Sequence, residues 1–291
     1  MSVKFVSDSS CDVHTLPGGD FTTVPLTIQL GEDGHYTDDK NLDVAVMLRA
    51  MAAHRGRSYT ACPSVHAWVD AFGDADEVYA VAMTSTLSGT YNAARLAREH
   101  YLEEHPQAKV KVFDTLTTGP EQRLFIEHLM ALKAEGLDFE TVCRRAQEYL
   151  HHTRLLYSQK SVHNFVQNGR IGKATAAALG ILGIRLLATA SPKGNIELLA
   201  KCRGEKKFLQ KLSDELAAAG FAGGKLYISH VQDPSLARSV AVLVQKRWPH
   251  SRIKVYPAGG LCSYYAEEGG LLIGFESERP RQNVSIAPIL K

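Results

Sequence analysis

The chain has 291 residues, more than one hydrophobic core usually organises, so we expect two domains with a cleft between them. Its 33 Lys and Arg against 31 Asp and Glu leave a formal net charge of +2, which argues against a protein that coats nucleic acid. The five cysteines are scattered and never in C-x-x-C spacing, which indicates neither a disulfide framework nor a metal site.

The N-terminus runs directly into an apolar, strand-like run, without the apolar core and small-residue cleavage site of a signal peptide. The most apolar stretch, residues 174–190, is interrupted by Arg185 and falls short of the roughly 18 uninterrupted apolar residues that a membrane-spanning helix needs. We therefore expect a protein that stays in the cytoplasm.

The first half of the chain alternates short apolar runs with amphipathic segments. The apolar runs predict strands at residues 3–7, 22–30, 77–83 and 109–113. The amphipathic segments predict helices at residues 41–54, 65–72, 90–104, 121–133 and 139–150. This alternation is typical of a parallel sheet.

The pattern changes beyond residue 152. Predicted strands lie at residues 155–159, 184–190, 196–199, 226–230, 253–256 and 271–275, and predicted helices at residues 204–219 and 235–247. The turn Lys193-Gly194-Asn195 joins two of these strands as a hairpin, so antiparallel pairing enters here. We therefore expect the domains to span residues 1–152 and 153–291, with a ligand cleft between them.

The strongest local signal is a turn rich in hydroxyl groups between a predicted strand and a predicted helix. It contains Thr84, Ser85, Thr86, Leu87, Ser88, Gly89 and Thr90. Ligands of open α/β sheets bind at that edge, and the unpaired N–H groups of a helix N-terminus favour an anion. Simple capping of the helix by Ser88 explains the same residues, so both interpretations stay open.

Two further polar segments are expected near that edge. Thr60-Ala61-Cys62-Pro63-Ser64 precedes a predicted helix, for which Ser64 is a suitable N-cap. Asp8, Ser9 and Ser10 end the first predicted strand, where a structural cap is the alternative role for Asp8. If these loops converge, they supply the oriented donors that a carboxylate needs.

Cations surround glycine-rich turns in the second half. Arg170 lies in Asn168-Gly169-Arg170-Ile171-Gly172, and Lys201 and Arg203 follow. They are either a docking or phosphate site or a solvated surface patch. The sequence contains no G-x-S-x-G, Walker P-loop, G-x-G-x-x-G or H-E-x-x-H motif, which removes the usual support for a serine hydrolase, an NTPase, a Rossmann dehydrogenase or a zinc protease.

Taken together, these segments resemble the DegV family along nearly the whole chain. Residues 6–12 resemble its opening D-S-S turn, and residues 24–26 with 36–39 resemble its second segment. Leu87-Ser88-Gly89-Thr90-Tyr91 is similar to the family's L-S-G-T-Y signature. Residues 112–115 resemble its V-x-D-S/T strand end and residues 168–171 its G-G-R-I turn. Each motif is weak singly, but their fixed order is specific.

The resemblance implies a three-layer α/β/α domain with a parallel sheet, followed by an α/β domain with a mixed sheet. It also implies a bound long-chain fatty acid at their junction and no cofactor. Bacterial proteins of this family serve as the fatty-acid-binding subunit of fatty acid kinase, whose separate kinase subunit carries out the ATP chemistry for phospholipid synthesis. On this view the chain is a carrier and not itself an enzyme.

Carried over by position, Thr60 and Ser88 are the expected donors to the carboxylate. The family usually reads T-S-Q-P-S where this chain has Ala61 and Cys62, and it has an H-x-G-P-G turn where this chain reads residues 261–270 without histidine. Tyr264 is the expected substitute donor there. Arg170, Lys201 and Arg203 match basic positions that dock the kinase subunit or make transient contact with a membrane surface.

Two other functions fit the sequence. One is an enzyme acting on a small carboxylated or phosphorylated substrate at the Ser88 turn, with Asp8 or Asp114 as base. A shallow polar site with a perturbed acid would favour it, whereas a carrier needs a long apolar tunnel. The other is a regulatory protein that senses fatty acid, which the kinase subunit would leave unphosphorylated.

Overall fold

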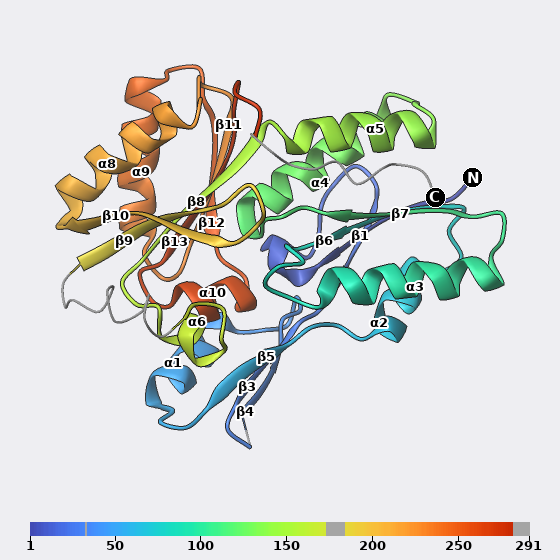
Figure 1. Cartoon of the computed structure of the whole chain (residues 1–291), viewed down its shortest axis with the longest axis horizontal. Coiled ribbons are helices and arrows are strands. Elements are labelled where there is room, and N and C mark those ends of the chain that lie inside the picture. Colours follow the sequence, from blue (N-terminus) through green and yellow to red (C-terminus); the bar gives the residue numbers. More distant parts are fainter. Residues whose placement is uncertain (33, 173–183, 282–291) are drawn as a thin grey trace.

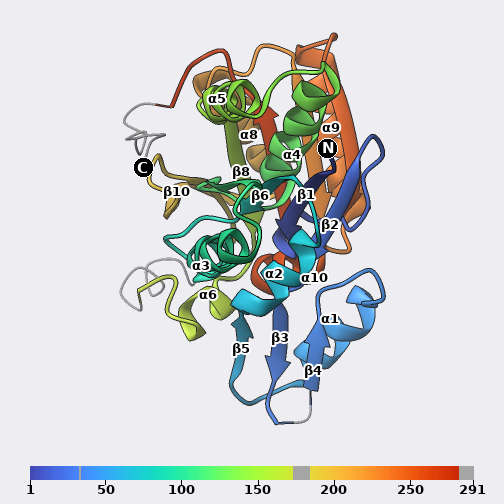
Figure 2. The ribbon, with the colours of Figure 1, turned by 90° about the vertical axis from the view of Figure 1, so that its right-hand side faces the viewer.

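A computed structural model describes residues 1–32, 34–172 and 184–281 of the chain. Three sheets and their helices make up this part (Figures 1 and 2). Most of the apolar stretch 174–190 lies outside the described residues. Within them, no helix combines the length and apolar character needed to cross a membrane.

The first sheet is parallel, as the alternation predicted. Its order is β2 (Asp20–Val24), β1 (Val3–Asp8), β6 (Glu77–Ala82) and β7 (Lys109–Asp114). Helices α2 (Val65–Phe72) and α3 (Thr90–Glu104) pack on one face, and α4 (Gly119–Ala134) and α5 (Phe139–Leu150) pack on the other. Successive side chains of β1 serve opposite faces: Phe5 joins the α4–α5 core and Val6 joins the α2–α3 core. The three-layer arrangement follows from this alternation.

A small antiparallel sheet corrects one prediction. Its order is β4 (Gly34–Thr37), β3 (Thr27–Leu30) and β5 (Ser58–Ala61), and it lies beside α1 (Val44–Ala53) at the bottom of Figure 2. The single strand predicted at residues 22–30 is wrong, because β2 ends at Val24 and β3 begins in this second sheet. Pro25 lacks an N–H group, and the N–H of Leu26 donates to Ser9 Oγ at 3.0 Å instead of to a strand.

The second half forms a mixed sheet, as the resemblance implies. Its order is β10 (Ile196–Arg203), β9 (Ile184–Ala190), β8 (Thr153–Gln159), β13 (Leu271–Glu276), β11 (Lys225–His230) and β12 (Arg252–Pro257). Only the β11–β12 pairing among these strands is parallel. Helices α8 (Glu205–Ala218) and α9 (Pro234–Arg247) cover one face with a common apolar core. The predicted hairpin is confirmed by the antiparallel pairing of β9 with β10.

Five short elements escaped the sequence patterns: β4, β5, η1 (Ser9–Cys11), α6 (His163–Gln167) and α10 (Gly260–Ala266). The two halves of the chain also touch closely. A Cβ on Gly274 of β13 would lie 2.3 Å from the backbone nitrogen of Glu121, so α4 of the first half rests directly on the mixed sheet. The division at residues 152 and 153 stays a prediction.

Candidate functional site

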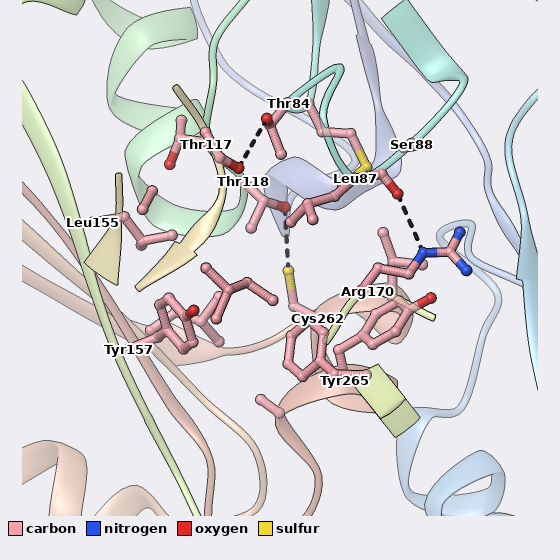
Figure 3. Close-up of a pocket in the computed structure, with 18 of the residues that line it drawn as sticks. Thr84, Leu87, Ser88, Thr117, Thr118, Leu155, Tyr157, Arg170, Cys262 and Tyr265 are labelled. Atoms are coloured by element: carbon pink, nitrogen blue, oxygen red, sulfur yellow. Dashed lines mark hydrogen bonds between the residues drawn. The ribbon is translucent and has the colours of Figure 1, made fainter. Parts of the chain in front are cut away.

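A largely apolar cavity lies between the carboxyl ends of the parallel strands and the face of the mixed sheet opposite α8 and α9 (Figure 3). It encloses about 780 Å³ of empty space, including space that opens to solvent. Its apolar wall is formed by Leu26, Met83, Leu87, Leu116, Leu155, Phe165, Ala190, Ile196, Leu261, Ala266 and Leu272. Ligand pockets are mainly apolar with a few polar groups, and the lining of this cavity has that character.

Strand alternation builds one side of the cavity. Leu155, Tyr157 and Gln159 follow one another at every second position of β8, and all three line the space. Leu272 of β13 pairs with Tyr157 in the antiparallel register and therefore faces the same side. The residues between them face away, and Leu156 belongs to the core under α8 and α9.

One end of the cavity is polar. Thr60 of β5 and Tyr265 of α10 share a hydrogen bond of 2.8 Å between their hydroxyl oxygens, and both line the space. The ring of Tyr265 stacks on Phe165 with 4.8 Å between centroids, which fixes the direction of its hydroxyl. Figure 3 shows Arg170 between Tyr265 and the Ser88 turn. Four side chains from four segments thus meet there.

Arg170 brings a positive charge to this end. Its Nε donates to the carbonyl of Leu87 at 3.2 Å, and its Nη1 donates to the carbonyl of Asn168 at 2.6 Å. Among the described residues no carboxylate pairs with it, although it is half-buried in the cavity wall. Because the carbonyls do not neutralise the guanidinium, an anion bound here would gain a charge-assisted hydrogen bond.

The Ser88 side chain is bonded to the start of α3 and also lines the cavity. Its Oγ accepts from the N–H of Thr90 at 3.3 Å and lies 2.7 Å from Thr90 Oγ1, but the N-cap of α3 is Gly89, one residue after the predicted position. The same side chain lines the cavity. A Cβ on Gly89 would lie 3.4 Å from Cys62 Sγ, so the Thr60 and Ser88 loops touch. The two loops converge, as the carboxylate hypothesis requires.

Tyr264 lies elsewhere than expected. Its side chain is fully buried, and its hydroxyl is bonded to Ser58 Oγ at 2.6 Å and to Asn168 Nδ2 at 2.9 Å. It is not part of the cavity wall, whereas Tyr265 is. Successive residues of a helix point about 100° apart, so only one of two adjacent tyrosines faces the cavity. Desolvation raises the pKa of Tyr265, which keeps its phenol protonated and able to donate.

Asp8, Ser9 and Ser10 are buried and lie off the cavity wall. Asp8 accepts from the N–H of Ser10 at 3.0 Å and from that of Met83 at 2.7 Å, so it caps η1 and ties β1 to β6. Burial raises the pKa of Asp8 to about 6. The contacts of Asp8 are therefore those of a structural cap, the alternative role that the sequence analysis gave it.

The rest of the hydroxyl-rich turn divides between cavity and surface. Thr84 lines the cavity and donates to the carbonyl of Gly194 at 3.1 Å. Thr90 is buried beneath Ser88, whereas Ser85 and Gly89 are exposed. The predicted N-cap is confirmed at Ser64, whose Oγ accepts from the N–H of Ala67 at 3.1 Å.

The remaining candidates lie outside the cavity wall. Asp114 accepts from the N–H of Ser85 at 3.1 Å, and burial raises its pKa. Lys201 and Arg203 are exposed on β10. In the described parts of the chain, no three His, Cys, Asp or Glu side chains gather as metal ligands would. No described acid lines the cavity.

Sequence patterns missed Tyr265, Phe165 and Gln159 as site residues. Phe165 and Tyr265 lie on α6 and α10, which have 5 and 7 residues and are too short for a helical period to stand out. The alternation of Leu155, Tyr157 and Gln159 was visible in the sequence and could have indicated a common face.

The fold and cavity define an α/β protein that encloses a mostly apolar ligand space between a parallel and a mixed sheet. The chain belongs to the DegV family: a family model described as "Uncharacterised protein, DegV family" matches residues 2–278. A DegV domain-containing protein of Streptococcus gordonii is 40% identical over 280 residues, which cover 95% of this chain and 99% of that one.

Two solved structures share the fold closely. A DegV family protein from Eubacterium eligens, loaded with heptadecanoic acid, is 46% identical, with a TM-score of 0.92 over 95% of this chain and 100% of that one. The Streptococcus pneumoniae Fatty Acid Kinase (Fak) B3 protein, loaded with linoleic acid, is 40% identical, with a TM-score of 0.93 over 96% and 100%. The family and fold that the motifs implied are confirmed.

Proposed function

We propose that this protein binds a long-chain fatty acid and presents it, in the cytoplasm, to a separate fatty acid kinase subunit. The observation that carries the proposal is the Arg170 guanidinium at one end of an apolar cavity, where no described carboxylate pairs with it. Thr60, Ser88 and Tyr265 surround it with hydroxyl groups. Tyr265 takes the role that the sequence assigned to Tyr264.

The energetics favour an acyl ligand. About fifteen buried methylenes at about 0.8 kcal/mol each would contribute on the order of 12 kcal/mol before ordering costs. The head-group residues then need only to orient the carboxylate and satisfy its oxygens. The E. eligens and S. pneumoniae proteins, whose crystal structures hold fatty acids, support the same class of ligand here.

The absence of a described acid from the cavity wall disfavours the small-substrate enzyme. Asp8 and Asp114 were the candidate bases, and both are held by backbone N–H groups outside the wall. The relative that is a Fatty Acid Kinase B3 protein supports a kinase partner over a sensor. The chemistry would then be carried out by that partner.

Native mass spectrometry of freshly purified protein, followed by lipid extraction, tests the binding. We expect a retained fatty acid, and we expect the double variant Thr60→Ala, Ser88→Ala to lose most of it. Ser85→Ala is the matched control, because Ser85 belongs to the same turn but is exposed and off the wall. Lipid content and bound pose that are unchanged in the double variant would refute this head-group site.

Presentation is tested by adding a purified kinase subunit and ATP and measuring acyl phosphate. Acid that stays bound and unphosphorylated would favour the sensor. Charge reversal at Lys201 and Arg203, which are exposed on β10, tests their proposed docking role. We expect slower phosphorylation or weaker cosedimentation with anionic vesicles. If charge reversal changed neither the phosphorylation rate nor the cosedimentation, Lys201 and Arg203 would have no docking role.

A further inference from the structure

Two polar side chains of β8 face the cavity without satisfied hydrogen bonds. Tyr157 is 8% exposed and Gln159 is 3% exposed. Within the described residues, neither the Tyr157 hydroxyl nor Gln159 Oε1 has a hydrogen-bond partner. Both side chains line the cavity and also a neighbouring lobe, whose empty space of about 660 Å³ includes space open to solvent and which shares Arg170 and Ile196 with the cavity. They therefore belong to the ligand space and not to the packed core.

The neighbours of Tyr157 and Gln159 in this wall are apolar, so an apolar side chain would also fit at these two positions. Leu155 occupies the equivalent position two residues earlier, and Leu272 and Ala188 are the cross-strand neighbours of Tyr157. All three line the same space with apolar atoms. A buried polar group without a partner destabilises a fold, so a phenol and an amide in this wall point to a partner that the ligand supplies.

The donors and acceptors of the two side chains indicate which ligand group would pair with them. Burial alone raises the pKa of Tyr157, so its phenol stays protonated and can donate as well as accept. The side-chain amide of Gln159 offers an acceptor oxygen and a donor nitrogen. The oxygen of an alcohol can therefore accept a hydrogen bond from the Tyr157 hydroxyl, while the alcohol O–H donates one to Gln159 Oε1. Figure 3 shows Tyr157 across the cavity from Ser88 and Arg170, so an alcohol bonded to Tyr157 would lie along the acyl chain, away from the carboxylate.

We propose that Tyr157 and Gln159 form a second polar subsite, which makes the cavity prefer a hydroxylated long-chain fatty acid over its unsubstituted parent. This inference rests on the proposed fatty-acid binding. An unsubstituted chain would leave both polar groups desolvated and unpaired, and a site built to hydrogen-bond a hydroxyl discriminates strongly against an analogue that lacks it.

The test compares octadecanoic acid with a panel of hydroxyoctadecanoic acids that carry the hydroxyl on every second carbon. Delipidated full-length protein is titrated with each acid in competition with a fluorescent fatty acid. We expect at least one isomer to bind about tenfold more tightly than octadecanoic acid. The double variant Tyr157→Phe, Gln159→Leu should abolish that preference and bind octadecanoic acid at least as tightly as the wild type.

Ser158→Ala is the matched control, because Ser158 lies between the two residues but faces away and accepts from Arg185 at 3.3 Å. It should keep the preference. Octadecanoic acid reports whether each variant is folded, and Tyr157→Phe alone serves if the double variant does not fold. Wild-type protein that binds octadecanoic acid as tightly as every isomer, or a double variant that keeps the preference, overturns the subsite. Protein that binds none of the acids overturns the proposed function as well.

Discussion

Two polar clusters lie near the ends of the parallel strands, and they differ in how fully their groups are bonded. Asp8 accepts from the N–H groups of Ser10 and Met83. At the cavity end, Arg170 has no carboxylate partner among the described residues, and Thr60 is bonded to the hydroxyl of Tyr265. Residue type alone does not separate a structural cluster from a binding site. These two clusters differ in whether the charged group has a partner: Asp8 is bonded by backbone N–H groups, and Arg170 has no described carboxylate beside it.

Other buried acids strengthen the structural side of this comparison. Asp12 accepts from Ser229 Oγ at 2.7 Å and from the N–H of Gly259 at 2.9 Å. Asp38 accepts from the N–H of Gly260 at 2.7 Å, at the start of α10. These acids hold α10 against the strand ends. They position the wall of the cavity without entering it.

The largest effect is expected at the bonded cluster. Asp8→Ala leaves two buried N–H groups without their acceptor and should lower the free energy of unfolding by about 3 kcal/mol. The folded fraction should still bind fatty acid with wild-type affinity. Urea unfolding and lipid titration check the two parts. Asp20→Ala is the control, since Asp20 is an exposed acid. A stable variant with weak lipid binding would show that Asp8 serves ligand binding and not the fold.

The pH dependence of stability sharpens the same contrast. Burial raises the pKa of Asp8 from 3.8 to about 6, so the folded state holds the proton more tightly than the unfolded state. The resulting stabilisation is complete below the unfolded pKa and is lost as the pH rises through the folded pKa. Relative to Asp8→Asn, the wild type should lose about 2 kcal/mol of unfolding free energy between about pH 4 and pH 6. A difference that stays constant over this range in urea titrations would contradict the shift.

At the cavity end, the effect should fall on binding and not on folding. Arg170→Met removes the positive charge at this end and should weaken fatty-acid binding by about 2 kcal/mol, or roughly thirtyfold, because hydrogen bonds to charged groups contribute about 1.5–3 kcal/mol. Thermal unfolding of the lipid-free protein should change little. Arg203→Met, an exposed arginine on β10, is the matched control. Equal losses in both variants would indicate a general charge effect.

The smallest effect separates two adjacent tyrosines. Tyr265→Phe should weaken fatty-acid binding by about 1 kcal/mol, since it removes one neutral hydrogen bond at the cavity end. Tyr264→Phe should leave affinity unchanged and lower stability by about 1 kcal/mol, because its hydroxyl bonds Ser58 and Asn168. Binding titration and urea unfolding of both variants measure this. The opposite pattern would restore Tyr264 to the site.

Local patterns were sufficient to predict most of the secondary structure. The predicted bounds of α3 and α5 match the structure at residues 90–104 and 139–150, because their apolar periods are long and regular. The strand at residues 22–30 was wrong, because the residues on both sides of Pro25 favour a strand and the change of sheet occurs at that proline. The convergence of the Thr60 and Ser88 segments does not follow from the parallel sheet alone, because Thr60 lies on β5 of the small antiparallel sheet and only Ser88 follows a parallel strand.

The sequence by itself determined the family, the two kinds of sheet and three of the hydroxyl groups that line the cavity, those of Thr60, Thr84 and Ser88. Only the tertiary structure decided that Tyr265 and Arg170 face the cavity while Tyr264 and Asp8 do not. The physical reason is the separation along the chain between the residues that interact. Periodicity is a property of neighbouring residues, whereas the partner that satisfies Tyr264 is Ser58, separated by 206 positions along the chain. Which polar atoms remain available to a ligand is settled only when such distant groups meet.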